Sequence, residues 1–105
     1  MEFVKIGLLS DFPEGKMRKV EVKGKELLVV NIDGKIYSID NICTHEECPL
    51  SDGFLQDEVV TCPCHLAQFN VKTGKKVANP ATGEDIEDEQ TFKVKVENSE
   101  VFVEV

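Results

Sequence analysis

The sequence predicts an all-β fold, and three observations support this prediction. Apolar and often β-branched residues recur in short segments with a period of two. Turn signals that contain glycine separate several of these segments. The sequence shows no sustained helical periodicity, no internal repeat and no low-complexity tract. With 105 residues, 41% of them hydrophobic, residues 1–105 are expected to form a single domain.

Two hairpins are expected in the first half of the chain. The segment 20–22 alternates apolar and charged residues, and Lys23-Gly24-Lys25 joins it to the apolar run 27–32. Asp33-Gly34 then leads from that run into residues 36–39. An Asp-Gly pair between two apolar segments is a strong signal for a two-residue hairpin turn.

A third hairpin is expected to close the chain. The alternating apolar residues before and after its turn at 97–100 are Phe92, Val94 and Val96, then Val101, Val103 and Val105. This spacing puts the valines of each strand on one face, so the hairpin should bury one side.

The residues with the clearest chemistry form two short boxes, Cys43-Thr44-His45 and Cys62-Pro63-Cys64-His65, separated by residues 46–61. Both histidines of the chain lie in these boxes. Thiolate and imidazole are the ligands that zinc and iron–sulfur clusters use in proteins. Because Pro49 and Gly53 mark this region as loops, the cysteines are unlike ordinary core residues of apolar strands.

Two kinds of metal site agree with this ligand set. Two cysteines and two histidines are a common set for one structural zinc ion, but zinc fingers usually pair cysteine with cysteine and histidine with histidine. Here each box mixes the two types. A mixed pair on each loop suits a binuclear cluster, in which both cysteines bind one iron and both histidines bind the other.

At this point the sequence resembles the Rieske family, whose pattern is Cys-x-His, a spacer and Cys-x-x-His around a [2Fe-2S] cluster. The resemblance implies that Cys43 and Cys62 bind the buried iron and that His45 and His65 bind the outer iron. It also implies a one-electron carrier with an antiparallel β-sandwich fold. A cluster-binding subdomain at about residues 41–81 would be inserted between framework strands, with Asn79-Pro80-Ala81 in a loop that covers the cluster.

The resemblance further implies a disulfide between Cys48 and Cys64, because Rieske proteins of cytochrome bc complexes carry one at these two places. The alternative is a pair of reduced thiols beneath the loops, which an intracellular location would favour. Both states remain open from the sequence.

The residues after the second box bear on the reduction potential. High-potential respiratory members have a serine and a tyrosine where this chain has Ala67 and Phe69. Both hydroxyl donors are therefore missing, so we expect a potential in the lower part of the Rieske range of roughly -150 to +300 mV. Leu66 also replaces the usual glycine after the second histidine.

Charge and hydropathy limit the partners. The net charge of -8 argues against nucleic-acid or anionic-membrane binding and favours an electropositive partner surface. Glu46 and Glu47 directly follow the first box and could steer such docking. The sequence has no long apolar run and no signal peptide, so a soluble cytoplasmic protein is expected. A second acidic stretch, expected to be a solvated loop, contains Glu84, Asp85, Glu87, Asp88 and Glu89.

An enzyme acting alone is not expected, because the histidines are assigned as ligands and no serine or cysteine has a spare histidine as its base. The chain looks like the ferredoxin components of ring-hydroxylating dioxygenase systems, which pass electrons from a reductase to a terminal oxygenase. The stretches 48–53 and 69–74 add to this resemblance. Two alternatives are kept: the small subunit of a nitrite-reductase-like complex, and the structural zinc domain.

Overall fold

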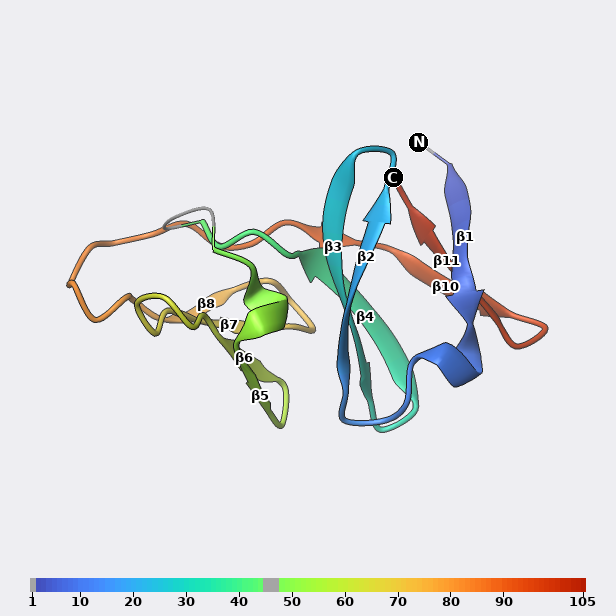
Figure 1. Cartoon of the computed structure of the whole chain (residues 1–105), viewed down its shortest axis with the longest axis horizontal. Helices are drawn as coiled ribbons and strands as arrows, with labels where there is room; N and C mark the ends of the chain where they lie inside the picture. Colours follow the sequence, from blue (N-terminus) through green and yellow to red (C-terminus); the bar gives the residue numbers. More distant parts are fainter. Residues whose placement is uncertain (1, 45–47) are drawn as a thin grey trace.

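The computed structural model describes residues 2–44 and 48–105, which form three antiparallel sheets along the longest dimension of the molecule (Figure 1). The first sheet has the order β1 (Phe3–Leu8), β11 (Glu100–Glu104) and β10 (Val94–Glu97). The second has the order β2 (Met17–Val22), β3 (Lys25–Ile32), β4 (Lys35–Asp40) and β9 (Thr91–Phe92). The third has the order β5 (Phe54–Gln56), β6 (Val59–Thr61), β7 (Gln68–Asn70) and β8 (Lys76–Ala78). Two short 3-10 turns, η1 (Leu9–Asp11) and η2 (Leu50–Asp52), are the helical segments in these ranges. The all-β prediction is confirmed.

The two hairpins of the second sheet have the turns that the sequence predicted. Asp33 and Gly34 connect β3 to β4 and have φ angles of 53° and 86°. Lys23 and Gly24 connect β2 to β3 with φ angles of 50° and 78°. A type I′ turn requires positive φ at both central residues, and its twist matches that of the flanking strands. Glycine at the second position removes the steric cost there.

The closing segment differs from the prediction. The strand expected from Phe92 to Val96 is divided at Lys93, because Thr91–Phe92 (β9) pairs with β4 and Val94–Glu97 (β10) pairs with β11. The chain therefore passes from the second sheet to the first at Lys93, in the middle of a segment where apolar and charged residues alternate. The alternation continues through Lys93, so the sequence pattern alone cannot show where the hydrogen-bonding partner changes.

The central strand β3 is covered on both faces. Leu28 and Val30 belong to the same buried cluster as Phe69 of the third sheet. Val29 faces the other way and packs in a cluster with Val101 of the first sheet. Since side chains alternate between the two faces of a strand, the continuous apolar run in β3 serves two cores at once.

The third sheet is inserted between two paired strands. β4 and β9 are neighbours in the second sheet, whereas β5 to β8 all lie between them in the sequence. Each of these four strands has only three residues, too few for a period-two pattern to be recognised. The sequence therefore did not predict them individually, nor did it predict β1.

Within the described ranges, no helix is long and apolar enough to cross a membrane.

Candidate metal centre

The first box lies on a loop that closes on itself. The amide N–H of Cys43 donates to the carbonyl oxygen of Cys48 at 3.0 Å, and Ile42 forms an isolated antiparallel bridge with Pro49. The fully buried side chain of Asn41 accepts the N–H of Ser51 at 2.8 Å through its Oδ1 atom. These contacts join the two sides of the loop at its base.

The second box forms a tight turn between β6 and β7. The N–H of Cys62 donates to the carbonyl oxygen of Ala67 at 2.7 Å, and the N–H of Leu66 donates to the carbonyl oxygen of Cys62 at 3.1 Å. Leu66 has a φ of 65° and a side chain that is 55% exposed. A glycine would adopt this left-handed conformation without strain, so leucine at this position costs some stability.

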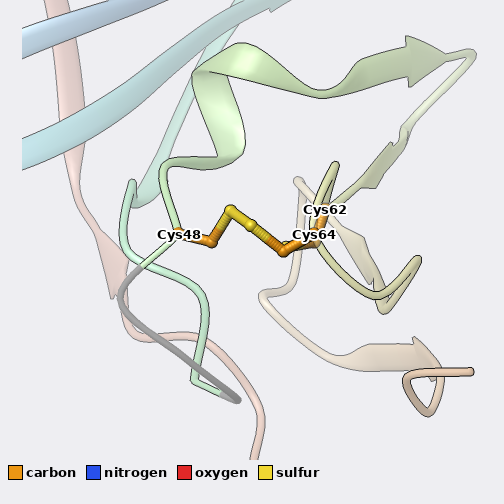
Figure 2. Close-up of side chains that lie close together, drawn as sticks. All are labelled: Cys48, Cys62 and Cys64. Atoms are coloured by element: carbon orange, nitrogen blue, oxygen red, sulfur yellow. A yellow bond between two sulfur atoms is a disulfide. The ribbon is translucent and has the colours of Figure 1, made fainter. Parts of the chain in front are cut away.

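A disulfide links the two loops. Figure 2 shows the bond between Cys48 and Cys64, whose Cα atoms are 6.4 Å apart. These are the two cysteines for which the resemblance to the Rieske family implied a bond. The Sγ atom of Cys62 lies close to it, since the Sγ atoms of all three cysteines fall within 4.8 Å of one another. Cys43 and Cys62 take no part in the disulfide, and both are buried, at 4% and 1% exposed.

Of the two histidines in the boxes, the structure describes His65. His65 is half-buried, and its Nδ1 atom is shielded from solvent. Its position directly after the disulfide-bonded Cys64 places its backbone at the junction of the two loops. His45, Glu46 and Glu47 lie outside the described residues, so the predictions made for them stay predictions.

A third segment, residues 79–90, contacts both ligand loops; we call it the strap. The N–H of Ala81 donates to the carbonyl oxygen of His65 at 2.6 Å. At the other end, the hydroxyl of Thr44 donates to the carbonyl oxygen of Glu87 at 2.7 Å. Pro80 is buried. The loop that contains Asn79-Pro80-Ala81 is thus fastened to the second box, and the same segment continues to the first.

Glu89 is a buried carboxyl group at the end of the strap. Its side chain is 6% exposed, in contrast to the solvated loop expected for the acidic stretch. Burial is the main cause that raises the pKa of Glu89 to about 8, and the nearby charge of Asp40 raises it further. A hydrogen bond from the main-chain amide of Thr44 acts in the opposite direction. Nothing in the pattern of the acidic stretch indicated that this one acid would be buried.

Comparison with known protein families decides the assignment. Residues 2–103 match the family model described as the Rieske [2Fe-2S] domain. The chain belongs to this family. Relatives with established descriptions agree. The ferredoxin component of the naphthalene 1,2-dioxygenase/salicylate 5-hydroxylase systems of Ralstonia sp. is 41% identical over 97 residues, covering 92% of this chain and 89% of the relative. The ferredoxin component of biphenyl 2,3-dioxygenase from Rhodococcus jostii is 36% identical over 105 residues, covering 100% and 94%.

Solved structures support the same assignment for this Rieske protein. The ferredoxin of carbazole 1,9a-dioxygenase from Nocardioides aromaticivorans superimposes with a TM-score of 0.88 at 28% identity, covering 98% of this chain and 97% of that chain. A second match, with a TM-score of 0.85 at 31% identity, is a chain in a complex of reduced oxygenase and oxidised ferredoxin of carbazole 1,9a-dioxygenase. It covers 96% of this chain and 100% of that chain.

Membership assigns a Rieske-type [2Fe-2S] cluster and the role of an electron carrier without catalytic turnover of its own. The described donors fit such a cluster: two buried thiols lie outside the disulfide, and a half-buried imidazole stands on the adjoining loop. Soft thiolates and borderline imidazoles are what the two kinds of iron in a Rieske cluster require. The zinc-domain and nitrite-reductase alternatives are therefore set aside.

This Rieske protein lacks the hydroxyl groups that raise the potential in the respiratory branch. Ala67 and Phe69 are both fully buried, and Phe69 belongs to the same apolar cluster as Cys43 and Cys62. These two positions are therefore apolar and carry no side-chain hydrogen-bond donor, which agrees with the low reduction potential that we expect.

Two residues near the site were missed by sequence reasoning. Thr44 was noted only as the residue between two ligand positions, and Glu89 only as one acid among five. Both residues matter because the strap folds back on the first loop. The residue spacing within either segment does not predict this packing.

Proposed function

We propose that Cys43 and Cys62 bind the inner iron and that His45 and His65 bind the outer iron. When bound, the [2Fe-2S] cluster supplies a one-electron redox couple. The burial of Cys43 and Cys62 supports the inner role, because thiolates that are shielded from water keep that iron away from competing ligands. The intermediate burial of His65 supports the outer role, since this residue is more exposed than the two buried cysteines.

We further propose that residues of about 41–81 act as the cluster-binding subdomain within one domain of residues 1–105. The third sheet supports this proposal, because its strands hold the second box between β6 and β7. The disulfide between Cys48 and Cys64 fastens the first box to that sheet. The strap begins within these limits and continues beyond them, and it contacts both boxes.

The role proposed for the chain is to pass single electrons from a reductase to a terminal oxygenase. One observation carries this proposal: the mixed cysteine–histidine boxes lie in a chain whose full length matches ferredoxin components of dioxygenase systems. The structural likeness to a ferredoxin in complex with its oxygenase supports the oxygenase as acceptor. The reductase as donor follows from the need to reduce the carrier again after each transfer.

Electron exchange is proposed to take place at the tip formed by the two boxes. Leu66, next to His65, is 55% exposed and gives this tip an apolar contact point. The strap beside it carries exposed acids, namely Glu84, Asp85, Glu87 and Asp88. With a net charge of -8, this arrangement favours a partner with an electropositive surface. The cytoplasm remains the proposed location, to be tested by fractionation of the source cells.

Metal analysis and spectroscopy of the purified protein test the ligand assignment. Iron and inorganic sulfide in equal amounts, with a low-g Rieske EPR signal after reduction, are expected. His65→Ala should abolish that signal, whereas Leu66→Ala, which changes the exposed neighbour, should retain it. A colourless protein with zinc in place of iron would refute the proposal.

Stopped-flow mixing tests the partner assignment. The reduced protein should reoxidise rapidly when mixed with a terminal oxygenase, with a rate that falls as the salt concentration rises. Glu46→Gln and Glu47→Gln should weaken that salt dependence. Rates that are independent of salt for the wild type would exclude an electropositive docking surface.

A further inference from the structure

Three of the four cysteines lie close enough to exchange bonding partners. The Sγ atoms of Cys48, Cys62 and Cys64 fall within 4.8 Å of one another, and the disulfide joins Cys48 to Cys64. Figure 2 shows Cys62 and Cys64 on one turn and Cys48 on the facing loop. Because bonded sulfurs are about 2.0 Å apart, the Cys62 sulfur has to move toward either sulfur of the bond by about 3 Å at most. A change of side-chain rotamer covers such a distance.

Contacts other than the disulfide also hold the two loops together. A Cβ atom at Gly53 would collide with the carbonyl oxygen of Thr61, so the segment after Cys48 runs directly against the residue before Cys62. Cys48 and Cys62 belong to the same buried apolar cluster. The N–H of Cys62 also donates to the carbonyl oxygen of Ala67 at 2.7 Å, which fixes its backbone. The three sulfurs therefore stay neighbours when the bond between two of them breaks.

Burial decides which sulfur of the disulfide Cys62 can attack with less cost. In thiol–disulfide exchange, a thiolate attacks one sulfur of the bond and expels the other as a thiolate. Cys48 is buried, whereas Cys64 is exposed. Attack on Cys48 expels the Cys64 thiolate into water, but attack on Cys64 would expel the Cys48 thiolate into the apolar cluster. Since an unpaired charge is costly to bury, the attack on Cys48 is favoured.

We propose that Cys62 is an internal exchange thiol, which takes Cys48 from Cys64 when the chain loses its cluster. A bond forms between the sulfurs of Cys62 and Cys48, the bond between Cys48 and Cys64 breaks, and its electron pair stays on Cys64. Cys62 is thereby oxidised and Cys64 reduced, so the exchange needs no external oxidant. The inference rests on the proposed role of Cys62 as an iron ligand. Cysteine ligands are bound in the deprotonated form, so Cys62 is a thiolate, the nucleophilic form, at the moment the cluster is lost.

The exchange couples the disulfide to the presence of the cluster. A Cys62 sulfur that binds iron cannot attack, so the bond between Cys48 and Cys64 persists in the loaded protein. After the exchange, Cys62 is tied to Cys48 and cannot bind iron, and Cys64 carries an exposed thiol. The chain can then accept a new cluster only after a dithiol reductant has opened the bond between Cys48 and Cys62.

Mass-spectrometric mapping of the cysteines tests the proposal. The loaded protein is stripped of its cluster with a chelator, without air or thiol reductant, and is alkylated in its native state with N-ethylmaleimide. Deuterated N-ethylmaleimide in acidic denaturant, which stops exchange, then labels the remaining thiols. In the stripped protein, the first label should lie on Cys64, and the bond between Cys48 and Cys62 should outnumber the bond between Cys48 and Cys64. The loaded protein should have no first label on Cys64 and should keep its original bond.

Two matched variants, each purified without a cluster, identify the attacking sulfur. Cys62→Ser and Cys43→Ser both remove a buried cysteine that takes no part in the disulfide. Cys64 should remain unlabelled in Cys62→Ser, whereas Cys43→Ser should show the same label on Cys64 as the stripped wild type.

The map of the wild type is decisive even if neither variant folds. An intact bond between Cys48 and Cys64 in the stripped protein would overturn the proposal. So would labels spread over all four cysteines, which would indicate unspecific exchange in an unfolded chain, or a labelled Cys64 in Cys62→Ser. A wild type without a Rieske EPR signal would instead refute the proposed function, and its cysteine map would still show whether Cys62 exchanges.

Discussion

The amide N–H of Ala81 donates a 2.6 Å hydrogen bond to the carbonyl oxygen of His65, so the strap is fastened to the backbone of a proposed ligand. Ala81 is also the second residue of a turn that the N–H of Gly83 closes on the carbonyl oxygen of Pro80 at 2.9 Å. The Ala81 amide is thus directed away from its own turn and toward the second box. This single bond connects the turn of the strap with the cluster-binding loop.

Ala81→Pro tests this connection. Proline suits the second position of a turn but has no N–H, so the variant deletes the bond to His65 and keeps the turn. One lost hydrogen bond of about 0.5–1.5 kcal/mol should speed cluster loss in a chelator by about 2- to 10-fold. Ala81→Ser, which keeps the amide, is the control. Equal rates for the proline variant and the wild type would show that the bond does not hold the loop.

The disulfide between Cys48 and Cys64 should stabilise the protein through the loop that it closes. In Cys48→Ala/Cys64→Ser, alanine replaces the buried cysteine and serine the exposed one. Unfolding free energy should fall by about 3 kcal/mol, measured by thermal denaturation followed by circular dichroism. The wild type with a reductant should approach the variant. On denatured protein, the thiol count should double when reductant is added, because two of the four cysteines are bonded; an unchanged count would contradict the bond.

Stability should depend on pH through Glu89. Its pKa is raised from 4.5 to about 8 in the folded protein, so between these values the folded state binds more protons than the unfolded state. Stability must then fall as pH rises from about 4.5 to about 8, by at most on the order of 5 kcal/mol. Glu89→Gln should remove most of this slope in thermal midpoints measured from pH 5 to pH 8. Glu84→Gln, at an exposed acid, should keep it. Parallel slopes for wild type and Glu89→Gln would exclude Glu89 as the source.

Ala67→Ser should raise the reduction potential. The variant adds a hydroxyl donor at the buried position where high-potential Rieske proteins have one, and a hydrogen bond to cluster sulfur favours the reduced state. A bond of about 0.5–1.5 kcal/mol corresponds to roughly 20–65 mV for one electron. Protein-film voltammetry measures the shift. Val60→Thr adds a hydroxyl elsewhere in the same buried cluster and should leave the potential unchanged. If both variants raised the potential equally, the cause would be the added polarity and not a hydrogen bond to cluster sulfur.

Much of the framework could be predicted from local sequence. Asp33-Gly34 and Lys23-Gly24 determine their hairpins because positive φ angles at these pairs match the twist of the adjoining strands. The short strands β5 to β8 could not be predicted, because three residues give no periodic signal. The change of sheet at Lys93 was equally hidden, since apolar and charged residues alternate on both sides of it.

The sequence by itself determined the chemistry of the site. Cysteine and histidine in each of two boxes limit the metal that can bind, whatever the surrounding fold. Only the tertiary structure decided how the boxes are held: Cys48 meets Cys64, Ala81 contacts the backbone of His65, and the hydroxyl of Thr44 donates to Glu87. Ligand identity is a property of individual side chains, whereas burial and hydrogen bonding depend on which distant segments pack together. For this reason one of five neighbouring acids became a buried group beside the ligand loop.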